Sequence, residues 1–174
     1  GSTEGFDQSS DGLRCHMHWA DYTAQRLMER GDEQVSASGI TPSGEFHIGH
    51  LREILSAEMI HRACLDAGMS SKYIFIVDSM DPLRRVYDFL SPEYEEFIGC
   101  PLAFIPAPEE DGSPGNGAIT YADHFLSPFL DSLEQIGVRP EVIMNHETYE
   151  KGLFAEYIDS AIANREEIRG IIQQ

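Results

Sequence analysis

The fold is set by the stretch Val35-Ser36-Ala37-Ser38-Gly39-Ile40-Thr41-Pro42-Ser43-Gly44-Glu45-Phe46-His47-Ile48-Gly49-His50-Leu51-Arg52. Its pattern predicts a short strand, a tight turn marked by proline and glycine, and the start of a helix. Small residues in such a turn let a nucleotide approach the backbone, and the free N–H groups of a helix start can bind phosphate. The stretch therefore predicts a nucleotide site where a strand passes into a helix.

Two histidines, His47 and His50, lie on one face of the expected helix start. There they can donate hydrogen bonds to phosphate oxygens, most strongly as charge builds in a transition state. Gly49, between them, leaves room for a flat base to stack against the backbone. Such a pair alone is more typical of a solvated helix start. The nucleotide interpretation therefore depends on the whole order of strand, turn, histidines and amphipathic helix.

Length and composition fit one globular domain. The chain has 174 residues, 41% of them hydrophobic and 10% aromatic, enough for one well-filled core. It has no apolar run near the length of a membrane span. Residues 1–16 are polar and rich in glycine and serine, so we expect a disordered leader or an expression remnant there. The domain is expected to comprise residues 17–174.

The net charge of −18 argues against a nucleic-acid-binding surface, because phosphate contacts need lysine and arginine. The acidic excess fits either adaptation to salt or a basic domain outside this chain. Three scattered cysteines, Cys15, Cys64 and Cys100, fit a reducing cytoplasm and argue against a disulfide framework or a zinc ribbon. We therefore expect a cytoplasmic protein with no metal site of its own.

The hydrophobic pattern alternates strands with helices. We expect strands at 35–40, 72–77 and 141–144, and helices at 19–30, 51–67, 120–136 and 153–172. The β-branched and aromatic run at 72–77 is typical of a strand covered on both faces. Because a right-handed crossover makes the strands of a βαβ unit parallel, the sequence predicts an α/β, Rossmann-like parallel sheet.

The same pattern predicts which side chains are buried. Trp19 is expected to be a core or staple residue, and Glu58 is expected to point outward from the 51–67 helix. The buried side of that helix is expected to comprise Leu51, Ile54, Leu55, Met59, Ala63 and Leu65. The inward side of the final helix is expected to comprise Phe154, Tyr157, Ile158, Ile162, Ile168 and Ile171.

Two carboxylates, Asp78 and Asp81, follow the second strand. Ligands of an open parallel sheet lie outside the carboxyl ends of its strands, so both should share an edge with residues 41–50. There they could hold an ammonium group or a ribose hydroxyl. The alternative is a structural role, as a helix cap or in an ion pair with Arg84 or Arg85. The breaker-rich residues 109–117 predict a surface loop.

Three segments resemble class I lysyl-tRNA synthetase, the form found mainly in archaea and some bacteria. They are Met-His-Trp-Ala-Asp at 17–21, Ser-Gly-Ile-Thr-Pro-Ser-Gly at 38–44 and His-Ile-Gly-His-Leu-Arg-Glu at 47–53. Weaker similarity is found at 78–85, 101–108, 121–125 and 164–166. The resemblance covers nearly all of the expected domain.

This resemblance implies that lysine and MgATP condense to lysyl-adenylate, and that the lysyl group then passes to tRNA. The magnesium ion would come with the nucleotide. The residues implied at the ATP site are Thr41, Ser43, His47, Gly49 and His50, with the two histidines catalytic. The residues implied at the lysine site are Gly39, Thr41, Asp78 and Asp81.

The sequence also departs from that family. It contains no Lys-Met-Ser-Lys-Ser motif, and the later aromatic residues of the lysine pocket and the anticodon-reading domain are absent. Ser79 and Pro82 differ from the acidic and basic residues expected there, and residues 116–119 replace a Cys-His pair. We therefore expect the first half of a catalytic fold, inactive alone and bound to lysine tRNA only with the C-terminal part.

Two alternatives remain. One is a free-standing nucleotidyltransferase that uses the same histidine signature; it would need a basic phosphate-binding residue near the end, where only Lys151, Arg165 and Arg169 occur. The other is a non-catalytic module that binds a nucleotide or a partner. An uncovered apolar face would favour a fragment, and its burial by a second copy would favour a homodimer.

Overall fold

A parallel three-stranded sheet forms the centre of the chain. The computed structural model describes residues 17–173, with strands β1 (Glu33–Ile40), β2 (Ser70–Val77) and β3 (Glu141–Met144) in the order β1-β2-β3. Both strand pairs are parallel, with Ile40 opposite Val77 and Val77 opposite Met144. The α/β fold predicted from the sequence is confirmed, and all three strands occur where they were predicted, within two residues.

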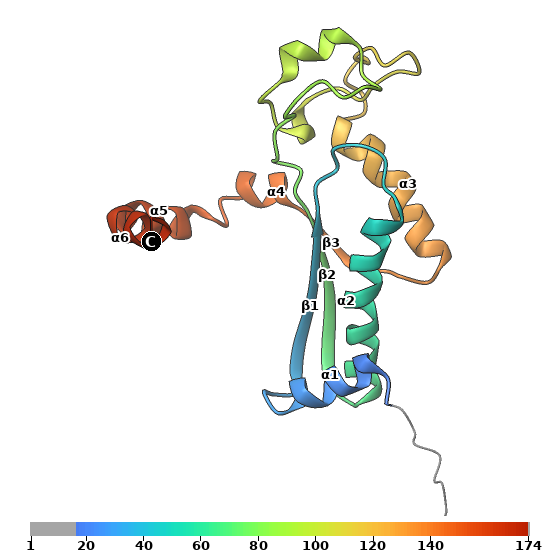
Figure 1. The fold of residues 1–174 in the computed structure, drawn as a ribbon, viewed down its shortest axis with the longest axis vertical. Coiled ribbons are helices and arrows are strands. Elements are labelled where there is room, and N and C mark those ends of the chain that lie inside the picture. Colours follow the sequence, from blue (N-terminus) through green and yellow to red (C-terminus); the bar gives the residue numbers. More distant parts are fainter. Residues whose placement is uncertain (1–16, 174) are drawn as a thin grey trace, which may run out of the picture.

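Helices α2 (Ile48–Asp66) and α3 (Tyr121–Gln135) lie on the same face of this sheet (Figure 1). One apolar cluster joins the two helices to the sheet, and its buried members include Ile54, Phe75, Leu126 and Leu133. On β2, Tyr73, Phe75 and Val77 are buried, whereas the alternate residues are half-buried or exposed. The prediction that this strand is covered on both faces is therefore wrong for the described part of the chain.

A small lobe between β2 and α3 occupies residues 78–120 (Figure 1). It contains two short 3-10 helices, η1 (Pro92–Phe97) and η2 (Leu102–Phe104). Its own apolar cluster includes Tyr94, Leu102, Ile105 and, from α3, Tyr121. Phe46, which precedes α2, packs against this cluster and against the sheet cluster. The lobe and the sheet are therefore joined at the turn that carries the histidines.

Helix α1 (Trp19–Met28) packs against α2 through a third cluster. Its buried residues are Ala20 and Ala24, whereas Trp19 is 46% exposed. Of the two roles expected for Trp19, the core position is wrong. It is the small side chains of α1 that let it approach α2 closely.

Helix α2 buries Ile54 and Ala63 as predicted, but Glu58 is only 7% exposed. Its carboxylate accepts a hydrogen bond from Arg62 Nε at 2.6 Å, and Arg62 also donates to the carbonyl of Gly137 at 2.8 Å. The prediction that Glu58 points outward is wrong, because this ion pair compensates the carboxylate for its burial. The predicted core residues Met59 and Leu65 are 37% and 47% exposed.

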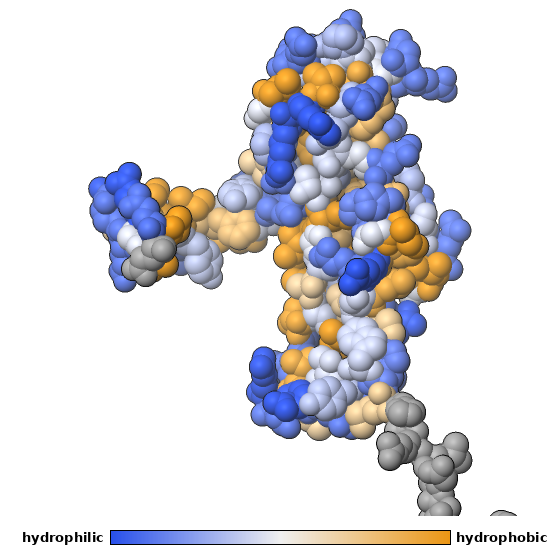
Figure 2. Space-filling model, in the orientation of Figure 1, coloured by the Kyte–Doolittle hydropathy of each residue, from blue (hydrophilic) through white to orange (hydrophobic). Residues whose placement is uncertain are grey.

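In the described part of the chain, three short helices follow β3, and the last two of them replace the single helix predicted at 153–172. They are α4 (Asn145–Glu150), α5 (Ala155–Ala163) and α6 (Arg165–Ile172), and α5 and α6 project away from the sheet (Figure 1). The predicted inward residues are largely exposed; Tyr157, Ile162 and Ile171 are 74%, 56% and 65% exposed. Figure 2 shows apolar surface on this helix pair. An apolar stripe is present, as predicted, but no other described element covers it.

The predicted leader, residues 1–16, lies outside the described residues. Across residues 17–173, none of the helices combines the length and the apolar character needed to cross a membrane.

The sheet cluster should dominate stability. Leu133 is 1% exposed and Leu65 is 47% exposed, and both are helical leucines. We expect Leu133→Ala to lower the free energy of unfolding by about 2 to 5 kcal/mol, because it leaves a cavity against the sheet. Leu65→Ala should cost less than about 1 kcal/mol. Urea unfolding followed by circular dichroism measures both, and equal losses would contradict this assignment of the core.

Candidate functional site

Two histidines cap helix α2 reciprocally. His47 Nδ1 accepts a hydrogen bond from the N–H of Gly49 at 3.0 Å, and His50 Nδ1 accepts one from the N–H of His47 at 3.0 Å. The ring centroids lie 3.9 Å apart. We call residues 41–50, which hold this arrangement, the signature turn. The helix begins at Ile48, earlier than the predicted 51, because the imidazoles bind N–H groups that the first turn leaves free.

This capping fixes where each neutral ring carries its proton. A backbone N–H can only donate, so each Nδ1 is an unprotonated acceptor and each neutral imidazole is protonated on Nε2. Burial and the neighbouring His47 lower the pKa of His50, which favours its neutral form at neutral pH. Each ring therefore retains one free N–H donor, at Nε2, of the kind that binds a phosphate oxygen.

Gly49 is required by the cap itself. A Cβ atom at this position would lie 2.8 Å from Cε1 of the His47 ring. The site therefore needs glycine here whether or not a base stacks on it. Gly49 borders a hollow of about 520 Å³ that it shares with Glu53 and Arg52. The role of Gly49 beneath an adenine stays a prediction.

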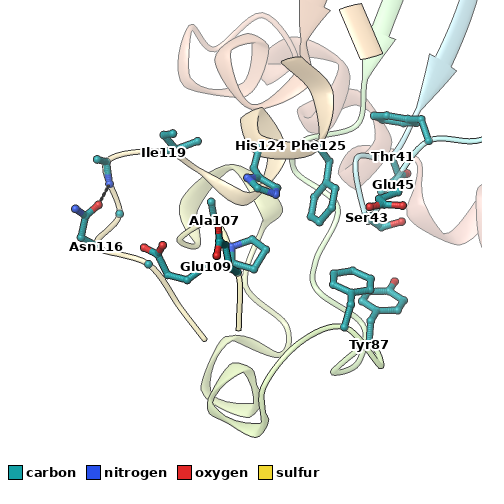
Figure 3. Close-up of a pocket in the computed structure, with 18 of the residues that line it drawn as sticks. Thr41, Ser43, Glu45, Tyr87, Ala107, Glu109, Asn116, Ile119, His124 and Phe125 are labelled. Atoms are coloured by element: carbon teal, nitrogen blue, oxygen red, sulfur yellow. Dashed lines mark hydrogen bonds between the residues drawn. The ribbon is translucent and has the colours of Figure 1, made fainter. Parts of the chain in front are cut away.

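A cavity of about 1120 Å³ opens beside the signature turn. Its volume slightly exceeds the usual range for small-molecule sites, about 300 to 1,000 Å³, so a nucleotide fits with room to spare. Figure 3 shows Thr41, Ser43 and Glu45 of the turn on one side, and Ala107, Glu109, Asn116 and Ile119 on the other. Other residues that line it are His47, His50, Tyr87, Phe89, His124 and Phe125.

The cavity wall opposite the turn is a loop held by backbone hydrogen bonds. Ala107 N donates to Ile119 O at 3.0 Å, and Glu109 N donates to Ser113 O at 2.8 Å. Residues 109–117 are the predicted loop, and the structure makes part of them a cavity wall. Composition identified the loop, but only the packing of the lobe against α3 places it here.

Asp78 and Asp81 lie at the carboxyl edge of the sheet, beside the turn. Thr41 Oγ1 donates to Asp81 Oδ2 at 2.8 Å, and the Arg84 guanidinium lies 3.3 Å from the same oxygen. Asp78 Oδ1 accepts a hydrogen bond from Asn145 Nδ2 at 3.3 Å. Burial and the neighbouring Asp81 raise the pKa of Asp78. The structure thus brings the predicted carboxylates to Thr41 and also forms the ion pair considered as the alternative for Asp81.

Glu53 is a further carboxylate at this edge, which the sequence analysis did not name as a candidate. Its carboxylate accepts a hydrogen bond from the N–H of Gly39 at 3.3 Å. It lies one helical turn after His50, and that spacing was the available signal. Together with Asp78 and Asp81, it gives this edge of the sheet three carboxylates.

The two unexpected residues after β2 have structural partners. Ser79 is fully buried, bonds His146 Nδ1 at 2.8 Å and accepts from the N–H of His146 at 3.1 Å, which ties β2 to α4. Pro82 forms an isolated antiparallel bridge with Pro101. Neither lines the large cavity. Among residues 17–173, no group of three or more His, Cys, Asp or Glu side chains is arranged to hold a metal ion.

Comparison with known proteins gives a consistent result. The family model described as tRNA synthetases class I (K) matches residues 17–174. A lysine–tRNA ligase of Methanocaldococcus jannaschii is 44% identical over 160 residues, which cover 91% of this chain and 29% of that protein. A lysine–tRNA ligase of Archaeoglobus fulgidus is 44% identical over 158 residues, covering 91% and 31%. Lysine–tRNA ligase 1 of Methanosarcina acetivorans is 42% identical over 158 residues, covering 91% and 28%.

Asp78 should make stability depend on pH. Because the pKa of Asp78 is raised in the folded chain, the unfolded chain loses the carboxyl proton at a lower pH. The free energy of unfolding therefore falls as the pH rises from the ordinary carboxyl pKa through the raised one. At neutral pH the carboxyl group is ionised in both states, and the full loss of stability is present. Asp78→Asn should therefore raise the urea midpoint at pH 7 and flatten its fall with pH, since an amide oxygen can still accept from Asn145.

The matched control is Asp88→Asn, which removes an exposed carboxylate and should change neither the midpoint nor its pH dependence. If the urea midpoint of Asp78→Asn falls between pH 3 and pH 7 as steeply as that of wild type, the pKa of Asp78 is not raised in the folded chain.

Proposed function

The chain belongs to the family of class I tRNA synthetases of the (K) group, and from this premise we propose that it forms the histidine-bearing part of a site that activates lysine with ATP. It spans 28% to 31% of the length of the curated relatives described above. The observation that carries the proposal is the reciprocal cap of His47 and His50 beside a large cavity.

In the proposed reaction, a carboxylate oxygen of lysine attacks the α-phosphorus of ATP. The bond from that phosphorus to the bridging oxygen of the β-phosphate breaks, and pyrophosphate leaves with the electron pair. No protein nucleophile is needed, so catalysis depends on positioning and on stabilisation of the developing charge. The Nε2–H groups of His47 and His50 would donate to the phosphate oxygens, and Thr41 and Ser43 line the same side of the cavity.

The lysine end of the site is proposed at the carboxyl edge of the sheet. Gly39, the last residue but one of β1, lies beside two carboxylates: Glu53 accepts from its N–H, and a Cβ at Gly39 would lie 4.0 Å from Asp78 Oδ2. Carboxylates in such a place attract an ammonium group. Asp78 is the stronger candidate, since the charge of Asp81 is shared with Arg84 and Thr41.

We place Mg²⁺ on the phosphates of the nucleotide, as is usual for a cation that keeps much of its water shell and uses few protein ligands. Transfer of the lysyl group to tRNA is proposed for the longer proteins of this family, of which this chain matches less than a third. This function places the chain in the cytoplasm, where protein synthesis uses its product.

Calorimetric titration with ATP and with a non-hydrolysable lysyl-adenylate analogue tests the proposal. We expect the analogue to bind, and His47→Asn to weaken it by about tenfold or more, a loss of about 1.4 kcal/mol or more, because one donor to the phosphate is removed. Asparagine is a good helix cap, so this variant keeps α2 intact where alanine would not. His61→Asn, on the same helix but bonded to Ser71, should bind as wild type does.

The outcomes separate the alternatives. ATP binding with no preference for the lysyl analogue would contradict lysine specificity and favour a nucleotidyltransferase. No binding of either ligand would contradict a preformed site in this chain. Sedimentation at the same concentrations tests whether two copies associate, as expected for a homodimer through an uncovered apolar face.

A further inference from the structure

The two catalytic candidates do not set their own position. His47 is exposed and His50 is only half-buried. Beyond their contacts with each other, the ring contact of the pair is the edge of Phe46, whose centroid lies 5.2 Å from that of His50. Rings with so little packing of their own depend for their position on the backbone that precedes them, which is the first part of the signature turn.

That part of the turn is held by α3. Pro42 is almost completely buried. Tyr121 Oη donates a hydrogen bond to the carbonyl of Ser43 at 2.8 Å, although the two residues are 78 positions apart in the sequence. Phe129 stacks on Phe46 with centroids 4.4 Å apart. Because Tyr121 and Phe129 are eight residues apart, they lie on one stripe of the helix, and this stripe runs along the turn.

Tyr121 is well suited to this contact. Its side chain is fully buried, at the first position of α3 and within the lobe's cluster. Burial raises its pKa, so the hydroxyl remains a neutral donor at any working pH. A buried phenol that donates a hydrogen bond to the carbonyl of a distant turn restricts where that carbonyl can lie.

We propose that Tyr121 is the positioning residue of the histidine pair: its hydrogen bond to Ser43 holds the signature turn so that His47 and His50 keep their reciprocal cap. It touches neither histidine and acts through the turn. The effect on the cap is independent of the proposed function, whereas the effect on ligand binding rests on it.

The chain contains a matched control. Tyr94 is also fully buried in the same cluster, and its Oη donates to a single carbonyl, that of Pro106, at 2.8 Å. Its ring centroid lies 6.1 Å from that of Tyr121. Burial raises the pKa of Tyr94 to about 12. Tyr94→Phe therefore removes the same kind of bond from the same core and leaves the signature turn untouched.

The experiment compares Tyr121→Phe with Tyr94→Phe in the full chain. NMR of the chain labelled with ¹⁵N-histidine reports the tautomer of each ring. The signals of His47 and His50 are assigned as those that disappear in His47→Asn and in His50→Asn. In wild type and Tyr94→Phe, both rings should be Nε2-protonated. In Tyr121→Phe, they should shift toward a mixture of tautomers, and the lysyl-adenylate analogue should bind about tenfold more weakly. Both variants should lower the urea midpoint similarly, so a stability loss alone explains neither change.

Unchanged histidine signals in Tyr121→Phe would overturn the proposal, as would an equal change in both variants, because Tyr121 would then be a core residue only. If the wild-type chain binds no analogue, the proposed function fails, and the NMR comparison still decides the role of Tyr121.

Discussion

Parallel pairing of β1 with β2 is the constraint on which the rest of the structure depends. Because Ile40 lies opposite Val77, the segments that follow the two strands leave the sheet at the same edge. The Thr41–Asp81 hydrogen bond joins these two segments directly. The crossover helix α2 must then begin beside it, which places the cap at the edge of the sheet. The lobe and α3 follow from where β2 ends, and they supply the remaining walls of the cavity.

The sequence predicted the elements whose signals are local. Strand β3 occurs at the predicted residues 141–144, and α3 (Tyr121–Gln135) lies within one residue of the predicted 120–136. Periodicity reveals that a face is apolar, but it does not reveal what covers that face. The stripe along α5 and α6 is therefore present yet exposed, and the predicted long helix is divided at Asn164. Glu58 was misplaced for the same reason, since its partner Arg62 bonds a loop distant in sequence.

For the site, topology was sufficient to bring Thr41 and Asp81 together, because strand ends in a parallel sheet meet by rule. The spacing of Glu53 from His50 is a local signal, but the contact of Glu53 with Gly39 and that of Tyr121 with Ser43 required the packing of two helices on the sheet. Their partners are backbone groups, the N–H of Gly39 and the carbonyl of Ser43. A side chain that bonds distant backbone leaves no pairing signal in a single sequence.

The proposed phosphate site lies in a chain with a net charge of −18, so it cannot depend on general electrostatic attraction. The proposal depends instead on the two histidine rings. With each Nδ1 bound to a backbone N–H, both imidazoles are donors at Nε2 while neutral, and the lowered pKa of His50 keeps it so. Neutral donors contribute only when they are held at the right place, since they exert little attraction at a distance. The acidity of the chain therefore makes the rigidity of the signature turn, and the buried contacts that supply it, the determining feature of the site.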